Sequence, residues 1–247
     1  MKPRRHTCLI AVAVLLGLVM SAALADEPEF TDTFRLENCR LRSWGLNDYF
    51  PLRPGYELLL EGEEEDETVT VLITVMPGIK RVDGSRCRVI REMEWADGEL
   101  VEISYNYFAI CWRCGTVFYL GEDVDIYEDG EIVSHEGAWL AGENDAKPGV
   151  IMPGCPLVGS RYYQELAPDV ALDRAEHASV TATVETPAGT FENCLTVVET
   201  TPLEPGEESE KAYAPGIGLV RDDELRLVEY GRHVTHPFPD DEEEDDD

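Results

Sequence analysis

The chain has 247 residues, and its 51 acidic and 20 basic side chains give a formal net charge of −31 at pH 7. A field of this sign repels nucleic acid and anionic membrane surfaces, and it attracts cations and basic partners. We therefore expect no nucleic-acid partner, and we expect divalent cations or basic proteins as partners. The length fits one all-β domain or two small ones, and we expect a monomer with a single domain.

The first 25 residues have the pattern of a secretory signal peptide. Lys2, Arg4 and Arg5 precede the apolar run LIAVAVLLGLVM, which is followed by the small-residue motif Ala23-Leu24-Ala25. A charged segment, an apolar segment and such a motif, in this order, are typical of an exported chain. No later segment is uniformly apolar over the length that a bilayer requires. The sequence predicts a signal peptide at 1–25, a periplasmic or extracellular protein, and no membrane insertion after cleavage.

Two runs of acidic residues interrupt the chain. They are EGEEEDE at 61–67 and DDEEEDDD at 240–247. Like charges repel one another and stay solvated, so the first run predicts a loop and the second a disordered acidic tail at 237–247. A single antiparallel β domain at 26–236 remains between the signal peptide and the tail.

Strand patterns fill most of this domain. Runs rich in β-branched and aromatic residues lie at 68–75, 87–95, 99–110 and 116–120, and further runs lie at 178–187, 189–202, 216–222 and 224–231. Pro77-Gly78, Asp83-Gly84 and Asp97-Gly98 separate the earlier runs, and the Asp-Gly pairs suit hairpin turns. The sequence predicts an all-β fold, an antiparallel meander that forms a sandwich or a curved half-barrel.

One segment, 161–177, departs from the strand pattern. Its mixture of arginine, glutamate and aspartate looks partly helical, although Pro168 interrupts it. We expect at most one short helix, in this segment.

Three further runs carry a resemblance. YFPLRPGYE at 49–57, TPAGTFENC at 186–194 and YAPGIGLV at 213–220 together resemble the recurrent pieces of secreted or periplasmic bacterial all-β proteins to which no activity is assigned. The block at 121–176 is similar to a subset of these proteins. The resemblance implies an antiparallel β fold and no reaction, because its glycines and prolines describe turns and strand starts.

The stretch DIYEDGEIVSHE at 125–136 fits two structures. Asp125, Asp129, Gly130 and Glu136 match the calcium loop of helix–loop–helix proteins, but Tyr127 replaces a carboxylate and the flanks look like strand and loop. A β-hairpin with Asp129-Gly130 as its turn explains the same letters with fewer exceptions. We therefore predict a hairpin.

The predicted hairpin still suggests a metal site. With a two-residue turn, Asp125 faces Ser134 and Asp123 faces Glu136, which clusters three carboxylates on one face. Facing carboxylates repel unless a cation lies between them, and calcium prefers oxygen ligands. We predict calcium as the cofactor, bound by Asp123, Asp125 and Glu136 with Glu122 as a further ligand.

The histidines and cysteines give weaker signals. His135 and Glu136 are adjacent on a strand and point to opposite faces, so they do not form an acid–base pair. The six cysteines after the signal peptide suggest disulfides, with fifteen pairings open. Cys111 and Cys114 have redox spacing but lack the helix that a redox site needs, which favours a structural or incidental pair.

These observations favour a binding protein over an enzyme. The chain has no G-x-S-x-G motif and no glycine-rich phosphate loop, and no catalytic residue is assigned. The first hypothesis is a binding protein for a divalent cation or a cell-envelope component. The alternatives are a carboxylate-based hydrolase near Glu122, Asp123, His135 and Glu136, and a carrier of an apolar ligand in a half-barrel cavity. Converging carboxylates would favour the cation, a deep polar cleft the enzyme, and an apolar cavity the carrier.

Overall fold

The structure is a computed structural model that describes residues 29–64 and 67–236. The predicted signal peptide at 1–25 and the predicted tail at 237–247 lie outside the described residues. A search of the described part of the chain for a helix of sufficient length and apolarity to cross a membrane finds none.

Nearly all regular structure in the described residues is β-strand. A single 3-10 turn, η1 (Leu36–Asn38), precedes the strands. The strands are β1 (Leu41–Arg42), β2 (Glu57–Glu64), β3 (Glu67–Val82), β4 (Ser85–Ala96), β5 (Glu99–Cys111), β6 (Val117–Glu128), β7 (Glu131–Ser134), β8 (Trp139–Leu140), β9 (Lys147–Met152), β10 (Arg161–Tyr163), β11 (Glu165–Leu166), β12 (Arg174–Thr186), β13 (Gly189–Thr200), β14 (Glu208–Ala214), β15 (Gly218–Asp222) and β16 (Leu225–Gly231).

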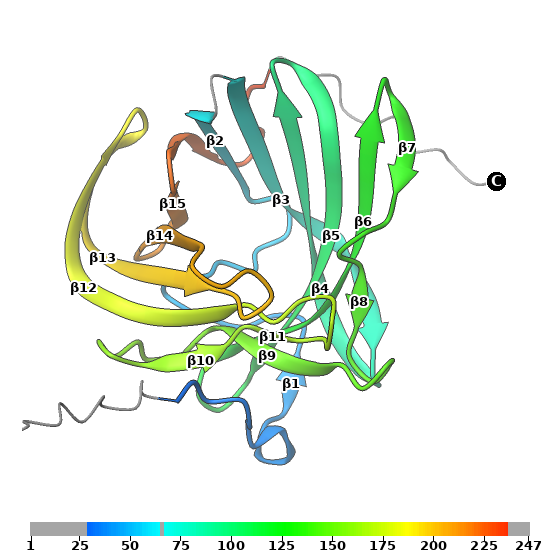
Figure 1. Ribbon diagram of the computed structural model, residues 1–247. Helices are drawn as coiled ribbons and strands as arrows, with labels where there is room; N and C mark the ends of the chain where they lie inside the picture. Colours follow the sequence, from blue (N-terminus) through cyan, green and yellow to red (C-terminus); the bar gives the residue numbers. More distant parts are fainter. Residues whose placement is uncertain (1–28, 65–66, 237–247) are drawn as a thin grey trace, which may run out of the picture.

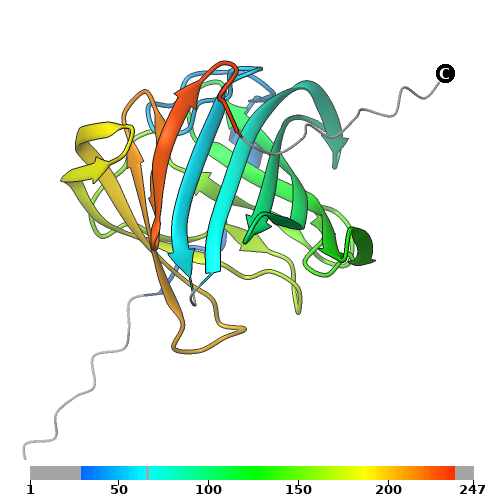
Figure 2. The ribbon, with the colours of Figure 1, turned by 90° about the horizontal axis from the view of Figure 1, so that it is seen from above.

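The strands form one antiparallel, barrel-like sheet. Its order is β10-β12-β13-β14-β15-β16-β2-β3-β4-β5-β6-β9-β11. β12 and β13 curve around one side and β3 to β6 form the other (Figure 1), and β16 joins the two sides by pairing with β2 (Figure 2). The two ends of the order, β10 and β11, are separated in the chain by Gln164 alone, so the path nearly closes on itself. The predicted all-β meander is confirmed as the curved, barrel-like form.

The predicted hairpin turns are also confirmed. Asp83-Gly84, Asp97-Gly98 and Asp129-Gly130 all have positive φ at both residues, which is the conformation that a two-residue turn requires. These turns connect β3 to β4, β4 to β5 and β6 to β7. The strong Asp-Gly signal therefore sets the first half of the meander.

Three local predictions were wrong. Pro77-Gly78 does not end a strand, because β3 continues through it with a register shift between Val75 and Ile79. The acidic run at 61–67 is not a loop as a whole, since 61–64 belong to β2 and Glu67 begins β3. The segment 161–177 is not helical, because β10 pairs with β12 and Arg161 lies opposite Glu176. Strand pairing outweighs the local sequence signal in each case.

The sheet buries apolar side chains on both faces. The larger cluster fills the inside of the curved sheet, and a smaller one on the opposite face contains Leu59, Leu72, Met93 and Ile103. Val234 covers this outer cluster, and its backbone N–H donates to the Glu57 carboxylate at 2.8 Å. The outer apolar face is thus shielded by the segment after β16.

The close approach of β9 and β11 generates a stability prediction. A Cβ atom at Gly149 would collide with the backbone oxygen of Gln164. We expect Gly149→Ala to lower the free energy of unfolding by about 1–3 kcal/mol, as overpacking does elsewhere. Gly78→Ala is the matched control, because a Cβ there meets nothing within 4 Å. Urea denaturation of both variants checks this, and equal stabilities would contradict the tight closure.

Candidate site in the barrel interior

The candidate site is a cavity of about 180 Å³ inside the barrel-like sheet. One part of its wall is apolar and is formed by Phe50, Pro51, Tyr56, Leu58, Ile73, Val75, Ile90, Phe108, Ile151 and Leu219. The polar part contains Glu92, Asn106, Gln164, Glu165, Asp173, Glu199, Lys211 and Asp222. Side chains of opposite character therefore meet in one enclosed space.

Strand alternation aims the polar side chains inward. Successive residues of a strand point to opposite faces, and Glu92 lies opposite Ile73 on one side and Ser104 on the other. In the same way Asn106 lies opposite Ile90 and Glu122. The inner face of β4 to β6 is thus partly acidic, although the opposite face of the same strands carries the outer apolar cluster.

Lys211 is the centre of an ion-pair network across the cavity. Its Nζ lies 3.2 Å from Glu199 Oε2 and 3.3 Å from Asp222 Oδ2. Glu199 Oε1 also accepts a hydrogen bond of 2.7 Å from Gln164 Nε2. Burial by itself lowers the pKa of Lys211, but Glu199 and Asp222 raise it well above its usual value. Lys211 is therefore a charged ammonium group inside the sheet.

Carboxyl groups outnumber this ammonium group. Among the described residues that line the cavity, Lys211 is the one basic side chain, and five are acidic: Glu92, Glu165, Asp173, Glu199 and Asp222. Burial raises the pKa of Glu92 to about 7, and burial is also the largest cause that raises the pKa of Asp173 and Asp222. The cavity therefore has more carboxyl groups than its one lysine can pair with.

Glu165 has a buried carboxyl oxygen, Oε2, that lacks a hydrogen-bond partner within the described part of the chain. Burial and then Glu122 raise the pKa of Glu165 well above its usual value. The indole N–H of Trp139 favours the charged forms of Glu122 and Glu165, yet it completes no hydrogen bond of good geometry. A buried carboxyl oxygen without a partner is costly.

Further carboxyl groups extend this acidic inner face. Glu94 and Glu102 lie directly opposite each other on β4 and β5. Burial, followed by the charge of Glu102, raises the pKa of Glu94 to about 7. Burial likewise raises the pKa of Glu122 to about 7, against the hydrogen bond with Tyr119. These three groups do not line the cavity itself.

The hairpin that carries the predicted calcium ligands has a different register from the predicted one. Tyr127 faces Ile132, as a two-residue turn at Asp129-Gly130 requires, but Ile126 faces Ser134, where Asp125 was expected. The shift arises because Val133 is an extra residue that forms a bulge between these pairs. The prediction that Asp125 faces Ser134 and Asp123 faces Glu136 was therefore wrong.

The predicted calcium ligands lie apart in the structure. Asp123 accepts from Lys80 Nζ at 3.3 Å and forms a short hydrogen bond with the Tyr107 hydroxyl. Asp125 Oδ1 lies 2.8 Å from His135 Nδ1.

Glu122 and Glu136 are the other two predicted calcium ligands. Glu136 follows β7, and its backbone N–H donates to Ser134 Oγ at 3.0 Å. Glu122 points into the barrel, away from its neighbour Asp123. The calcium site remains a prediction, and the structure gives Asp123 and Asp125 protein partners instead of bringing all four carboxylates together.

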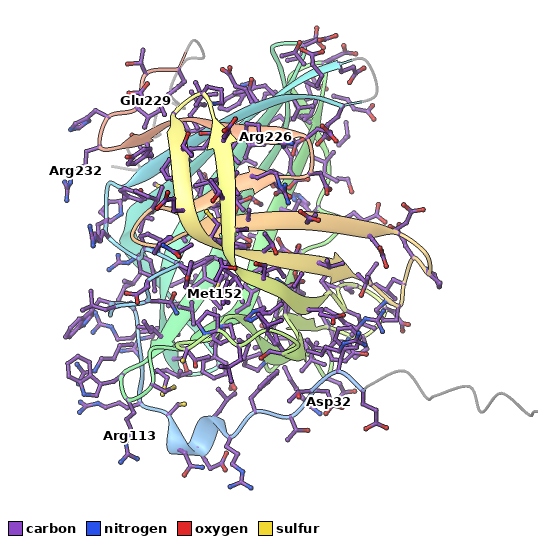
Figure 3. The ribbon with its side chains drawn as sticks, turned by 90° about the vertical axis from the view of Figure 1, so that its left-hand side faces the viewer. Asp32, Arg113, Met152, Arg226, Glu229 and Arg232 are labelled. Carbon is purple, nitrogen blue, oxygen red and sulfur yellow. The ribbon has the colours of Figure 1, made fainter. Side chains whose placement is uncertain are left out.

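The cysteines are unpaired. All six that the structure describes are free thiols, so the suggested disulfides are not formed in this structure. Cys87 and Cys194 are buried. Cys39, Cys111 and Cys114 gather near η1, at the end of the molecule where Arg113 lies (Figure 3).

Comparison of the chain with protein-family models, with curated proteins and with solved structures finds no match. The fold and the site together define a class: an all-β, barrel-like protein with an interior cavity that both acidic and apolar side chains line.

The acidic interior generates a pH prediction. The pKa of Glu94 is about 7 in the folded protein against an ordinary value of 4.5. Between these pH values the folded protein keeps a proton that the unfolded chain has released, so the free energy of unfolding falls as the pH rises. We expect Glu94→Gln to raise this free energy by about 1–3 kcal/mol above pH 7 and to change it little below pH 4.5.

Denaturation by urea across this pH range measures the effect. Glu99→Gln is the matched control, because Glu99 lies exposed near the start of the neighbouring strand. Two results would show that Glu94 does not keep its proton in the folded protein. They are an equal change in the free energy of unfolding in both variants, and a change in Glu94→Gln that is larger below pH 4.5 than above pH 7.

Proposed function

We propose that the protein binds a small organic cation, a molecule with an apolar body and an amine-type group, in the cavity of the barrel-like sheet. The observation that supports this is the convergence of five carboxyl groups and one ammonium group in a cavity that apolar side chains also line. The protein is a binding protein in this proposal, which agrees with the class that the sequence favours.

The charge of the cavity favours a cationic ligand group. Carboxylates that leave water lose hydration, and a nearby positive charge restores part of this loss. Lys211 pairs with Glu199 and Asp222, which leaves Glu92, Glu165 and Asp173 as the cavity carboxyl groups without an ion pair to a basic side chain in the described residues. A ligand amine beside Glu165 would donate a hydrogen bond to its unpartnered Oε2 atom, and the other carboxyl groups of the cavity would favour its positive charge.

The apolar wall favours an organic ligand over a metal ion. Phe108 stacks on Tyr119 with ring centroids 4.7 Å apart and meets Phe50 edge-on at 5.0 Å. Such rings pack against apolar groups and attract cations to their faces. A divalent cation would find no ligands on this wall, and Lys211 would repel it. The same apolar wall would contact the body of an organic cation.

The volume limits the ligand to a small molecule. A cavity of roughly 150 Å³ is sufficient for benzene, and this cavity measures about 180 Å³. One aromatic ring or a short aliphatic chain with its amine therefore fits inside. A larger ligand would leave part of its body outside the sheet.

The hydrolase alternative has less support. It requires Glu122 near Asp123, His135 and Glu136, but Glu122 points into the barrel and Asp123 to the opposite face. The carrier of a purely apolar ligand is also less favoured, because such a ligand would leave the Glu165 oxygen without a partner.

Calorimetric titration with benzylamine, benzyl alcohol and phenylacetate tests the proposal. We expect saturable binding of the amine alone, with an affinity that rises as the pH increases through 7, because Glu92 then loses its proton. Equal binding of the alcohol would favour the apolar carrier instead. Tighter binding of calcium in competition with the amine would favour the divalent cation, and no saturable binding of any probe would reject the cavity as a ligand site.

Three substitutions test which side chains of the cavity bind the amine. We expect Glu92→Gln to weaken amine binding about tenfold, or 1.4 kcal/mol, because it removes a charge from the cavity wall. Glu94→Gln is the matched control: Glu94 is two residues along the same face of β4 and does not line the cavity. Lys211→Met should have the opposite effect and tighten amine binding, since it removes the cavity's own cation. Equal effects of the two glutamate variants would contradict binding at Glu92.

A further inference from the structure

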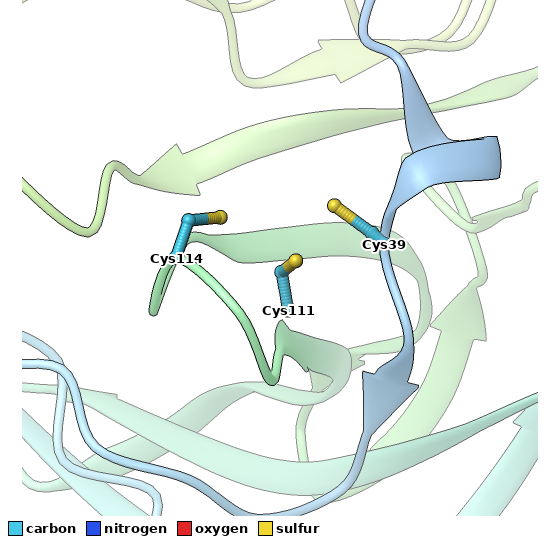
Figure 4. A group of neighbouring side chains, drawn as sticks. All are labelled: Cys39, Cys111 and Cys114. Carbon is cyan, nitrogen blue, oxygen red and sulfur yellow. The ribbon is translucent and has the colours of Figure 1, made fainter.

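A group of three thiols lies outside the cavity. The sulfur atoms of Cys39, Cys111 and Cys114 are all within 4.8 Å of one another, and Figure 4 shows them directed toward a common space. This is the one group of three such ligand atoms that the described residues form. Cys39 is far from the other two in the sequence, so the fold assembles the group.

Strand pairing brings Cys39 to the other two cysteines. β1 follows Cys39 closely and pairs with the end of β5, where Leu41 lies opposite Cys111. The backbone N–H of Trp112 donates to the carbonyl oxygen of Arg40 at 3.1 Å, and the N–H of Cys39 donates to Leu36 at 2.9 Å. The position of Cys39 is therefore fixed by hydrogen bonds on both sides.

The loop after β5 holds Cys111 and Cys114 in a tight turn. The Gly115 N–H donates to the Cys111 carbonyl at 2.9 Å, and the Cys111 N–H donates to Thr116 at 2.8 Å. Gly115 has φ +74, and a Cβ there would press on the carbonyl oxygen of Leu46, so the turn requires glycine. The geometry of the pair is thus set by the backbone before any ligand binds.

Polar groups lie beside the sulfurs. The backbone N–H groups of Arg113 and Cys114 donate toward the Cys111 sulfur. Cys114 Sγ lies 3.3 Å from Thr116 Oγ1, which accepts from the Gly154 N–H at 3.2 Å. The Thr116 hydroxyl can donate to Cys114 once that thiol is ionised, in the manner of groups that orient metal ligands.

We propose that Cys39, Cys111 and Cys114 form a site for a thiophilic metal ion, with zinc as the ion to test. Zinc–sulfur bonds of about 2.3 Å in a tetrahedron place sulfurs roughly 3.8 Å apart, which lies within the spacing of this group. Three sulfurs fill three positions, and the exposed side of Cys114 leaves the fourth to water or an external ligand. A single disulfide would use two of the three thiols, and the third thiol would remain free beside it.

Titration of the reduced, chelator-treated full chain with cadmium and zinc tests the site. The acidic segments of the chain can bind these ions through oxygen, so the readout is sulfur-to-cadmium charge-transfer absorption, which reports thiolate ligands alone. We expect one equivalent of cadmium to saturate this absorption, zinc to displace it, and bound metal to slow the alkylation of Cys39 and Cys114, the two members of the group that are not buried. No absorption, or a disulfide among the three cysteines that forms in place of metal uptake, would overturn the proposal.

Serine variants assign the ligands. Cys39→Ser and Cys114→Ser should each reduce the affinity for cadmium at least about tenfold, and both positions have some solvent exposure, so the substitution is compatible with folding. Cys155→Ser, at an exposed thiol outside the group, and Cys194→Ser, at a buried one, are the matched controls and should bind as the unmodified chain does. Unchanged binding in Cys39→Ser would overturn the site even if Cys114→Ser failed to fold.

Discussion

Closure of the sheet at Gln164 is the constraint on which the remaining structure depends. This residue separates the two terminal strands of the sheet, β10 and β11. Its side-chain amide donates to Glu199 on β13, while its backbone oxygen packs against Gly149 on β9. Strands from both halves of the chain are therefore held around one space, and the charges of β4, β14 and β15 are directed toward it together.

The closure also gives the two faces of the sheet an unusual distribution of side chains. In most half-buried sheets the polar residues face water. Here Glu92 and Glu94 face the interior, while Met93 between them packs with Leu59 and Leu72 on the outside. The outer apolar surface is stable because Val234 covers it. The interior carboxyl groups are stable only so far as Lys211, protons or a ligand neutralise them.

The sequence predicts the meander better than it predicts the site, and the reason is physical. Asp-Gly pairs and alternating apolar residues are local signals, and they correctly locate parts of β3 to β6 and the three Asp-Gly turns, although β3 continues through Pro77-Gly78. The inward direction of Glu92 and the ion pairs of Lys211 depend on which face of the sheet is enclosed, and no local pattern specifies that. The same holds for Cys39, which reaches Cys111 through the pairing of β1 with β5.

Two kinds of acidity must be distinguished in this chain. Exposed carboxylates keep a protein soluble and are sufficient to explain much of a net charge of −31. The carboxyl groups of the cavity do not serve this purpose, because the sheet encloses them and burial raises the pKa of Glu92 and Glu165. Apolar residues of similar size would give a more stable interior. Groups that lower stability and converge on a cavity are typical of functional sites, so the interior acids support the proposed ligand site and the surface acids do not.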